Sequence, residues 1–196
     1  DVARFGDDES VFYFRRGRDA RTIKPMRFRG KNTMDLATEA ATAIERLKPD
    51  AVFVDGGGVG GGVVDRLKML GYRVIEVQSG EKARDEEKYL NRRAEMWGEM
   101  RDWLMHGCIP NDEQLIDDLT GPEYALHLKG QIKLESKDAM KKRGLASPDD
   151  GDALALTFAE PVSRMDAATA RRMNRMRGMV AESSYDIFNS EGVAGM

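Results

Sequence analysis

Acidic residues that could hold a metal ion occur at three separated points of this sequence. Asp1 begins the chain, Asp55 follows the apolar run 51–54, and Asp149 and Asp152 lie in a segment with helix-start signals. Where a fold gathers such points at one edge of a mixed sheet, their carboxylates form an all-oxygen pocket. Mg²⁺ and Mn²⁺ prefer oxygen ligands and, in such pockets, support cleavage of phosphodiesters. The pattern therefore predicts a divalent-metal site built from distant residues.

The last acidic segment, residues 147–152 (SPDDGD), has the composition of a helix start, with serine at the N-cap and proline at the first helical position. Acids in the first turn favour the helix dipole, which by itself accounts for Asp149 and Asp150. Asp152 runs directly into the apolar residues 153–156 and needs a partner there. Residues three apart share a helix face, so Asp149 and Asp152 point together. We expect Asp152 to be a metal ligand, Asp149 an accessory ligand and Asp150 a helix cap.

Asp55 follows a short apolar run that is typical of a strand buried on both faces. The carboxyl ends of such strands are where ligand sites of α/β sheets collect, although an aspartate before glycine is also a common turn residue. Residues 56–62 include six glycines, which allow close backbone approach and expose amides at a helix start. The segment lacks the Gly-Lys-Ser/Thr of a Walker A loop and the context of a dinucleotide site. These features favour a functional role for Asp55.

The elements that must position these residues alternate between strands and helices. An antiparallel three-strand meander is predicted at residues 1–5, 10–14 and 21–29, a buried strand at 51–54 and a further strand at 72–77. Helices are expected from residue 32 or 33 to Pro49, over 59–71 and 96–104, near 113–119 and over 148–159, with a hairpin within 124–134. The charged segment 79–90 is expected to be a mobile loop. The fold class is therefore α/β, a mixed sheet flanked by helices.

Composition limits the possibilities further. With 196 residues the chain supports one core, expected over residues 1–160, followed by a basic, methionine-rich tail at 161–196 that is partly helical or disordered. The chain opens inside strand-like sequence, so we expect a domain cut from a larger protein. No apolar run is long enough to cross a bilayer. Cys108 is the only cysteine and there are two histidines, which excludes thiolate zinc sites and histidine cages.

Charge gives a weaker signal. The 31 basic and 34 acidic residues leave a net charge of −3, which does not by itself indicate a nucleic-acid partner. Basic residues are nevertheless concentrated within 131–143. The candidates for contact with a nucleic-acid backbone are Arg4, Lys133, Lys137, Lys141, Lys142 and Arg143. For each one taken alone, a solvated helix face or an ion pair with a neighbouring acid explains the charge equally well.

Taken together, three motifs resemble a known family. DVARFGDDES at residues 1–10, VDGGGVG at 54–60 and SPDDGDALAL at 147–156 are similar to the acidic motifs of the nuclease domain of tailed-phage or prophage terminase large subunits. The resemblance spans residues 1 to about 160, and the order and spacing of all three motifs make it specific. It implies an RNase H-like fold, shared with Holliday-junction resolvases and DDE transposases.

The resemblance also implies an activity: two-metal cleavage of concatemeric double-stranded viral DNA during genome packaging. By motif match, Asp1, Asp55 and Asp152 take the primary catalytic and metal-ligand roles, and Asp149 occupies the position three before the last acid. The implied cofactors are two Mg²⁺ or Mn²⁺ ions. The implied partners are DNA, a packaging ATPase domain in the same full-length chain, the portal and the small terminase subunit, with no membrane, in the cytoplasm of a host cell. No Walker A and B pair is present in this sequence.

The expected reaction is in-line hydrolysis with two ions roughly 3.5–4 Å apart. Asp55, between the other acids, is expected to bridge them. Two alternatives from other classes remain open. One is a nucleotide-binding ATPase of the actin or sugar-kinase type, which shares a strand meander, an early aspartate and a glycine-rich loop. The other is a non-catalytic module that docks on a packaging motor through its basic tail.

Overall fold

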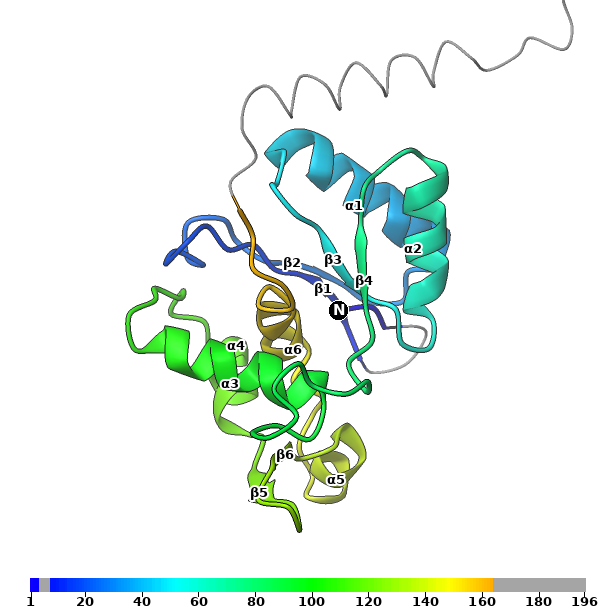
Figure 1. Ribbon diagram of the computed structural model, residues 1–196. Helices are drawn as coiled ribbons and strands as arrows, with labels where there is room; N and C mark the ends of the chain where they lie inside the picture. Colours follow the sequence, from blue (N-terminus) through cyan, green and yellow to red (C-terminus); the bar gives the residue numbers. More distant parts are fainter. Residues whose placement is uncertain (4–7, 164–196) are drawn as a thin grey trace, which may run out of the picture. The chain divides into compact units, whose positions relative to one another are not determined.

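The amino-terminal part of the chain forms an antiparallel meander (Figure 1). In this computed structural model, which describes residues 1–3 and 8–163, β1 (Ser10–Phe12) pairs with β2 (Met26–Phe28), and Val11 lies opposite Arg27. On its other side Val11 exchanges two backbone hydrogen bonds with Asp1, at 3.1 and 2.9 Å. Asp1 therefore extends the pair in the way the three-strand prediction requires, although the strands are shorter than predicted.

Two parallel strands carry the second acidic motif. β3 (Phe53–Asp55) pairs with β4 (Ile75–Val77) so that Asp55 lies opposite Val77 at the carboxyl end of both. The helices α1 (Thr33–Leu47) and α2 (Gly60–Met69) precede and follow β3. Of the two possible start residues, Asn32 caps α1 by accepting the N–H of Asp35. These connections deliver Asp55 to the edge where the first and third motifs must meet.

The parallel strands are covered on both faces. Val54 packs into a cluster formed by α1 and α2, whereas Phe53 and Val77 contact a second cluster. That second cluster is built from α3 (Arg92–Leu104), α4 (Glu113–Thr120) and α6 (Asp149–Leu156), which Figure 1 shows on the side away from α1 and α2. Burial on both faces explains why residues 51–54 are continuously apolar. The α/β class predicted from the sequence is confirmed.

The remaining elements complete the unit formed by residues 1–162. The predicted hairpin consists of β5 (Tyr124–Leu126) and β6 (Ile132–Leu134), and a helix that was not predicted separately, α5 (Lys137–Lys142), follows it. The segment 79–90, expected to be mobile, is anchored instead. The buried carboxylate of Glu95 accepts the backbone N–H groups of Arg84 and Asp85, each at 3.0 Å, and Tyr89 is buried.

The predicted tail lies mostly outside the described residues, as do Arg4 and its neighbours up to residue 7. The division into a domain at 1–160 and a tail at 161–196 therefore stays a prediction. Among the described residues, every helix is too short or too polar to cross a bilayer.

One glycine explains how α2 meets the end of β3. A Cβ at Gly60 would lie 1.8 Å from the carbonyl oxygen of Asp55, whereas a Cβ at Gly61 would meet nothing closer than 3.7 Å. We expect Gly60→Ala to lower the free energy of unfolding by roughly 2–4 kcal/mol, because the backbone itself must move. Gly61→Ala, in the same helical turn, should be neutral or slightly stabilising. Urea unfolding of both variants tests this, and equal stabilities would contradict the packing described.

Candidate metal centre

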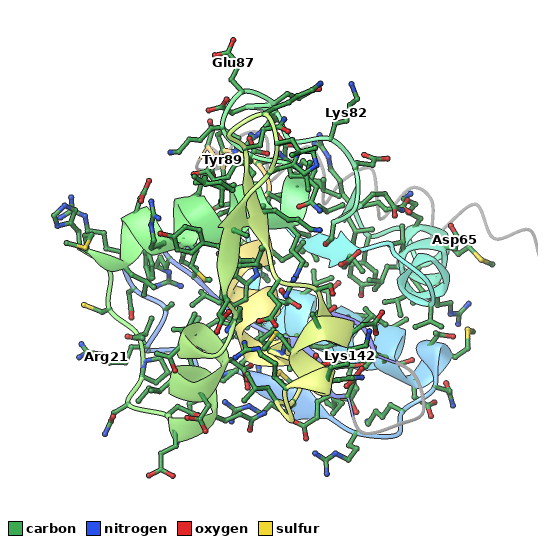
Figure 2. All side chains as sticks on the ribbon, turned by 90° about the horizontal axis from the view of Figure 1, so that it is seen from below. Arg21, Asp65, Lys82, Glu87, Tyr89 and Lys142 are labelled. Carbon is green, nitrogen blue, oxygen red and sulfur yellow. The ribbon has the colours of Figure 1, made fainter. Side chains whose placement is uncertain are left out.

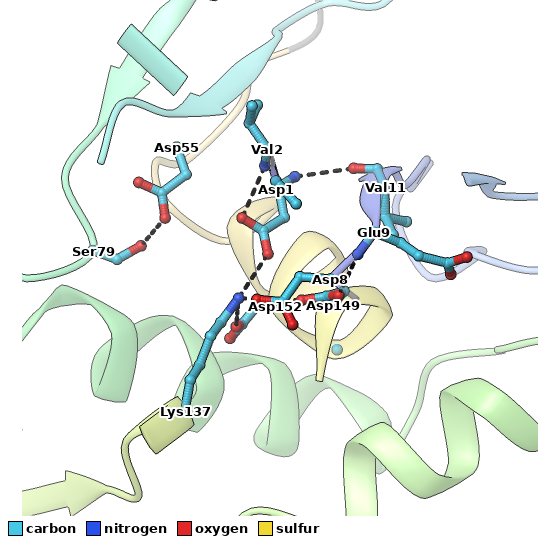
Figure 3. Close-up of polar contacts among 12 residues, drawn as sticks. Asp1, Val2, Asp8, Glu9, Val11, Asp55, Ser79, Lys137, Asp149 and Asp152 are labelled. Carbon is cyan, nitrogen blue, oxygen red and sulfur yellow. Dashed lines mark hydrogen bonds and ion pairs between the residues drawn. The ribbon is translucent and has the colours of Figure 1, made fainter. Parts of the chain in front are cut away.

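The three acidic motifs meet in one pocket at the carboxyl end of β3. Its polar lining comes from Asp1, Asp55 and Asp152 together with Ser79, Arg93 and Trp97, above an apolar floor of Met96, Ala155 and Leu156. Residues as distant in the sequence as Asp1 and Asp152 thus face a common space (Figure 3). This is the convergence that the sequence predicted.

Asp55 is oriented by the chain on either side of it. Its Oδ1 accepts the backbone N–H of Gly57 at 2.9 Å, and its Oδ2 accepts the hydroxyl of Ser79 at 2.6 Å. Ser79 follows β4, so the parallel pairing of the two strands brings donor and acceptor together. The N–H groups of Gly56 and Gly60 bond to backbone carbonyls within the protein. In this arrangement the glycine-rich segment serves close packing and leaves those amides unavailable to a phosphate.

A lysine lies among three of the carboxylates. Lys137 Nζ is 3.0 Å from Asp1 Oδ2, 3.2 Å from Asp149 Oδ1 and 3.1 Å from Asp152 Oδ2. Figure 3 shows its side chain reaching from α5 into this group, with Asp55 and Ser79 paired to one side. Burial alone would lower the pKa of Lys137, but the adjacent carboxylates outweigh it and raise the pKa above its usual value. The ammonium is therefore charged and neutralises part of the site.

Asp152 has the partners that its position before a buried helix demands. Its Oδ1 accepts the Nε–H of Arg93 and the indole N–H of Trp97, each at 2.8 Å. Arg93 also donates to the carbonyl of Glu135 at 2.7 Å, which fixes the guanidinium. Burial opposes ionisation of Asp152, yet Arg93 and Lys137 outweigh it and hold the pKa of the carboxyl below its usual value. Asp152 is an ionised group held in one orientation.

Asp149 faces the same ammonium as Asp152, in agreement with their three-residue spacing. Its Oδ2 accepts the backbone N–H of Glu9 at 2.7 Å, and its Oδ1 contacts Lys137. Burial raises the pKa of Asp149 despite the neighbouring lysine. Asp149 thus ties the start of α6 to the chain just before β1.

The prediction that Asp150 caps α6 is wrong. Its side chain is fully buried and both oxygens accept the Nε–H of Arg27, at 3.0 and 2.8 Å. The predicted serine cap, Ser147, is also wrong, because α6 begins after Pro148 without a side-chain cap of its own. Asp118 of α4 replaces both: its Oδ2 accepts the N–H groups of Asp150 and Gly151, at 2.8 and 3.2 Å. A side chain of the neighbouring helix α4 thus accepts the backbone N–H groups at the start of α6.

The candidates for DNA contact are in different situations. Lys137 contacts Asp1, Asp149 and Asp152 beside the pocket. Lys141 pairs with Asp8 at 3.1 Å, and Arg143 pairs with Glu135 at 2.5 Å, so their charges are already balanced. Lys133 and Lys142 are exposed, and Arg4 lies outside the described residues.

The sequence reasoning missed Ser79, Arg93 and the indole N–H of Trp97. The ring of Trp97 packs in the core, while its indole N–H donates to Asp152. A usable signal existed: Arg93 and Trp97 are four residues apart and share a helix face. A buried aspartate that needs donors, together with a helix face presenting two, would have suggested the pairing.

The donor set fits a hard divalent cation. All four candidate ligands are carboxylates, which Mg²⁺ and Mn²⁺ prefer, and three of them already converge on one positive charge, the ammonium of Lys137. Among residues 1–3 and 8–163, no three acidic, histidine or cysteine side chains stand placed to hold an ion as they are. An ion entering here has to displace Lys137 and draw the carboxylates together.

Solved structures share this fold. The K428A mutant nuclease domain of the large terminase subunit gp2 of bacterial virus Sf6, with manganese and beta-thujaplicinol, superposes with a TM-score of 0.71 at 16% identity, covering 82% of this chain and 86% of that one. The same domain without the mutation gives 0.71 at 17% identity, covering 82% and 86%. The large terminase nuclease from thermophilic phage G20c with bound magnesium gives 0.51 at 15%, covering 81% and 85%.

No family model and no curated protein matches the chain. At these identities the similarity establishes the fold, and the fold predicted from the three motifs, that of terminase nuclease domains, is confirmed.

Removing the central ammonium should expose the repulsion it balances. In Lys137→Met the carboxylates of Asp1, Asp149 and Asp152 lose their shared cation, so we expect the free energy of unfolding in EDTA at pH 7 to fall by about 1–3 kcal/mol. Added Mg²⁺ should then raise the melting temperature more than it does in the unmodified protein. Lys142→Met, on the same helix but exposed, is the matched control. Equal melting temperatures for the two variants in EDTA would contradict the role of Lys137.

Asp118 should give a pH dependence of its own. Burial, reinforced by Asp150 and Asp149 and opposed by two backbone N–H groups, raises its pKa to about 7. Because the folded protein binds this proton more tightly than the unfolded chain, Asp118 adds stability below about pH 4, and that contribution disappears as the pH rises to about 7. Asp118→Asn should remove on the order of 2 kcal/mol of this pH-dependent change. Denaturation series from pH 4 to 8 in EDTA measure it, with the exposed Asp117→Asn as control; a slope unchanged in Asp118→Asn would refute the assignment.

Proposed function

We propose that this chain is the metal-dependent DNA endonuclease domain of a viral genome-packaging terminase, which cleaves concatemeric double-stranded DNA. One observation carries the proposal: Asp1, Asp55 and Asp152, from three distant motifs, line a single pocket. The fold around that pocket is the one found in terminase nuclease domains, some of which were solved with manganese or magnesium. Together these support hydrolysis of a phosphodiester.

Asp1, Asp55, Asp149 and Asp152 would hold two Mg²⁺ or Mn²⁺ ions, with Asp55 as the shared ligand. When bound, such ions activate water and stabilise the charge that develops on the phosphate and on the departing oxygen. Asp55 would take the bridging role because both of its oxygens are held in place, by Ser79 and by Gly57, at the carboxyl end of β3.

The other residues of the pocket orient and balance these ligands. Arg93 and Trp97 fix Asp152, whose second oxygen, Oδ2, contacts Lys137 and accepts a longer hydrogen bond from Arg93. In the absence of substrate, Lys137 bridges three carboxylates and reduces the repulsion among them. Once its ammonium leaves the carboxylates, the same flexible side chain can contact a phosphate oxygen of the scissile nucleotide. The chain would thus carry its own counter-charge from the ligands to the substrate.

The full-length context belongs to the same proposal. A packaging ATPase domain in the same polypeptide, the portal and the small subunit would present DNA to this domain in a host cell. The alternative of an actin-like or kinase-like ATPase gains no support, since the amides of Gly56, Gly57 and Gly60 are bonded within the protein. The docking-module alternative rests on the basic tail, of which the described residues include only the first three.

Loss of one ligand should abolish cleavage. We expect Asp55→Asn and Asp152→Asn to reduce Mn²⁺-dependent nicking of a supercoiled plasmid at least about 100-fold, because each removes a charged ligand to the ions. Asp65→Asn, which changes an exposed acid on α2, is the control and should cleave normally. Cleavage should also stop in EDTA and return with Mn²⁺ or Mg²⁺.

Circular dichroism must show that the variants are folded. This check matters most for Asp152→Asn, whose side chain also pairs with Arg93. Asp55→Asn lacks that complication, since its partners are a hydroxyl and a backbone amide. Folded Asp55→Asn protein that still nicks the plasmid would defeat the proposal.

A further inference from the structure

The connection between β1 and β2 is far longer than a hairpin needs. It covers residues 13–25 and joins strands of three residues each, whereas hairpin loops usually have about two to five residues. Long connections in compact domains are usually functional or disordered. Within it, the basic loop, defined as residues 15–24, has a single acid, Asp19, against five basic residues: Arg15, Arg16, Arg18, Arg21 and Lys24.

The backbone of the basic loop is fixed in place. Arg16 and Asp19 exchange backbone hydrogen bonds at 2.7 and 3.0 Å, which closes a tight turn. The N–H of Ala20 donates to the carbonyl of Cys108 at 2.9 Å, and the N–H of Cys108 donates to the carbonyl of Arg18 at 2.8 Å. The loop is therefore hydrogen-bonded to the α3–α4 connection, and its side chains extend from a backbone that is held in place.

One arginine serves as an anchor. Arg15 donates to Thr157 Oγ1 at 2.8 Å and to the Thr157 carbonyl at 2.7 Å, and its guanidinium lies 4.1 Å from the ring centroid of Phe158. Trp103 adds a hydrogen bond from its indole N–H to the carbonyl of Gly17 at 3.0 Å. The root of the basic loop is thus bound to the residues that follow α6.

This anchoring sets the distance between the basic loop and the acids of the pocket. Thr157 follows Asp152 by five residues, which is about 7.5 Å along a helix axis. The basic loop is attached at the carboxyl end of α6, while the metal-binding acids lie at its amino end. With one phosphate of each strand per about 3.4 Å of the duplex axis, the extended arginine side chains would reach phosphates roughly three to six nucleotides from the scissile bond.

The charge of the basic loop is not balanced locally. Asp19 Oδ1 accepts the backbone N–H groups of Arg21 and Thr22, at 2.8 and 3.1 Å, so its carboxylate serves the backbone. The side chains of Arg16, Arg18, Arg21 and Lys24 are exposed and form no ion pair with an acid of the described residues. In Figure 2, Arg21 projects outward at the edge of the molecule opposite Asp65.

We propose that the basic loop, residues 15–24, is a contact surface for the phosphate backbone of duplex DNA beside the cleavage site. This inference rests on the proposed function and adds a binding surface to it. Guanidinium groups bind phosphate oxygens bidentately, and three of the four exposed basic residues are arginines. No large apolar side chain of the basic loop is exposed, so it lacks the apolar centre that a protein interface would need.

The test compares two triple variants that lose the same charge. One is Arg16→Gln, Arg18→Gln and Arg21→Gln. The control is Arg46→Gln, Lys48→Gln and Arg73→Gln, which neutralises exposed basic residues of α1, its C-cap and the segment before β4. Both are made in the Asp55→Asn background, so that a 30-bp fluorescent duplex stays intact in Mg²⁺. Fluorescence anisotropy from 50 to 200 mM KCl gives the salt dependence of binding.

If the basic loop contacts three phosphates, its variant should show a slope of log K against log[salt] that is shallower by about 2–3. Its affinity at 100 mM salt should fall roughly tenfold or more, and the control should stay within about twofold of the Asp55→Asn parent. In the otherwise unmodified chain, the same three changes should raise the DNA concentration needed for half-maximal nicking and leave the rate at saturating DNA unchanged.

The outcomes separate the two proposals. Failure of the unmodified protein to bind or nick DNA would refute the proposed function. Normal nicking together with a basic-loop variant that keeps the parental slope would overturn this inference alone, and would indicate that the loop meets another partner. If the triple variant does not fold, Arg21→Gln alone should lower the slope by about 0.9, and an unchanged slope there would equally overturn it.

Discussion

The pocket depends on the balance between like-charged carboxylates and the few cations placed among them. Four acids in a partly buried space repel one another, and each loses hydration that bulk water would supply. Lys137 contacts three of them, and Arg93 forms a second ion pair with Asp152. Without these two side chains the burial and mutual repulsion of the acids would be uncompensated, and the convergence of the three motifs would be unfavourable.

Helix α6 fixes the positions of two of these acids, Asp149 and Asp152. Its first turn is held by Asp118 and by the pair between Asp150 and Arg27, and its far end receives Arg15. Because both ends are tied to other elements, Asp149 and Asp152 have little freedom to change register. A buried polar network of this kind gives orientation more than stability, since its desolvation offsets much of the pairing energy.

Much of this arrangement follows from local rules in the sequence. Asp55 was predicted at the pocket because a buried apolar strand must end there, and Asp149 and Asp152 were predicted to point together from helical spacing alone. The same spacing cannot say which face of α6 meets which neighbour, and so Asp150 was mistaken for a cap. Its partner, Arg27, is more than a hundred residues away, and only tertiary packing brings it near.

The position of Lys137 could not be predicted from local sequence patterns. By composition it belongs to a run of basic residues, where a solvated helix face or a DNA contact accounts for it equally well. Its position among the acids depends on how the β5–β6 hairpin delivers α5, which no local pattern encodes. The pairing of Asp1 with β1 was easier to predict, because segments that are close in the sequence need only to find a near neighbour.

The net charge of these side chains limits how many divalent ions the site can bind. Asp1, Asp55, Asp149 and Asp152 carry four negative charges when ionised, and Arg93 offsets one of them once an ion has displaced Lys137. A first divalent ion would then leave one negative charge on these residues. A second ion would bring an excess of positive charge that nothing else lining the pocket can balance, whereas the phosphate of a bound strand can. In the proposed nuclease, the residues of this chain would therefore couple full metal occupancy to the arrival of DNA, and the site would not be fully assembled before then.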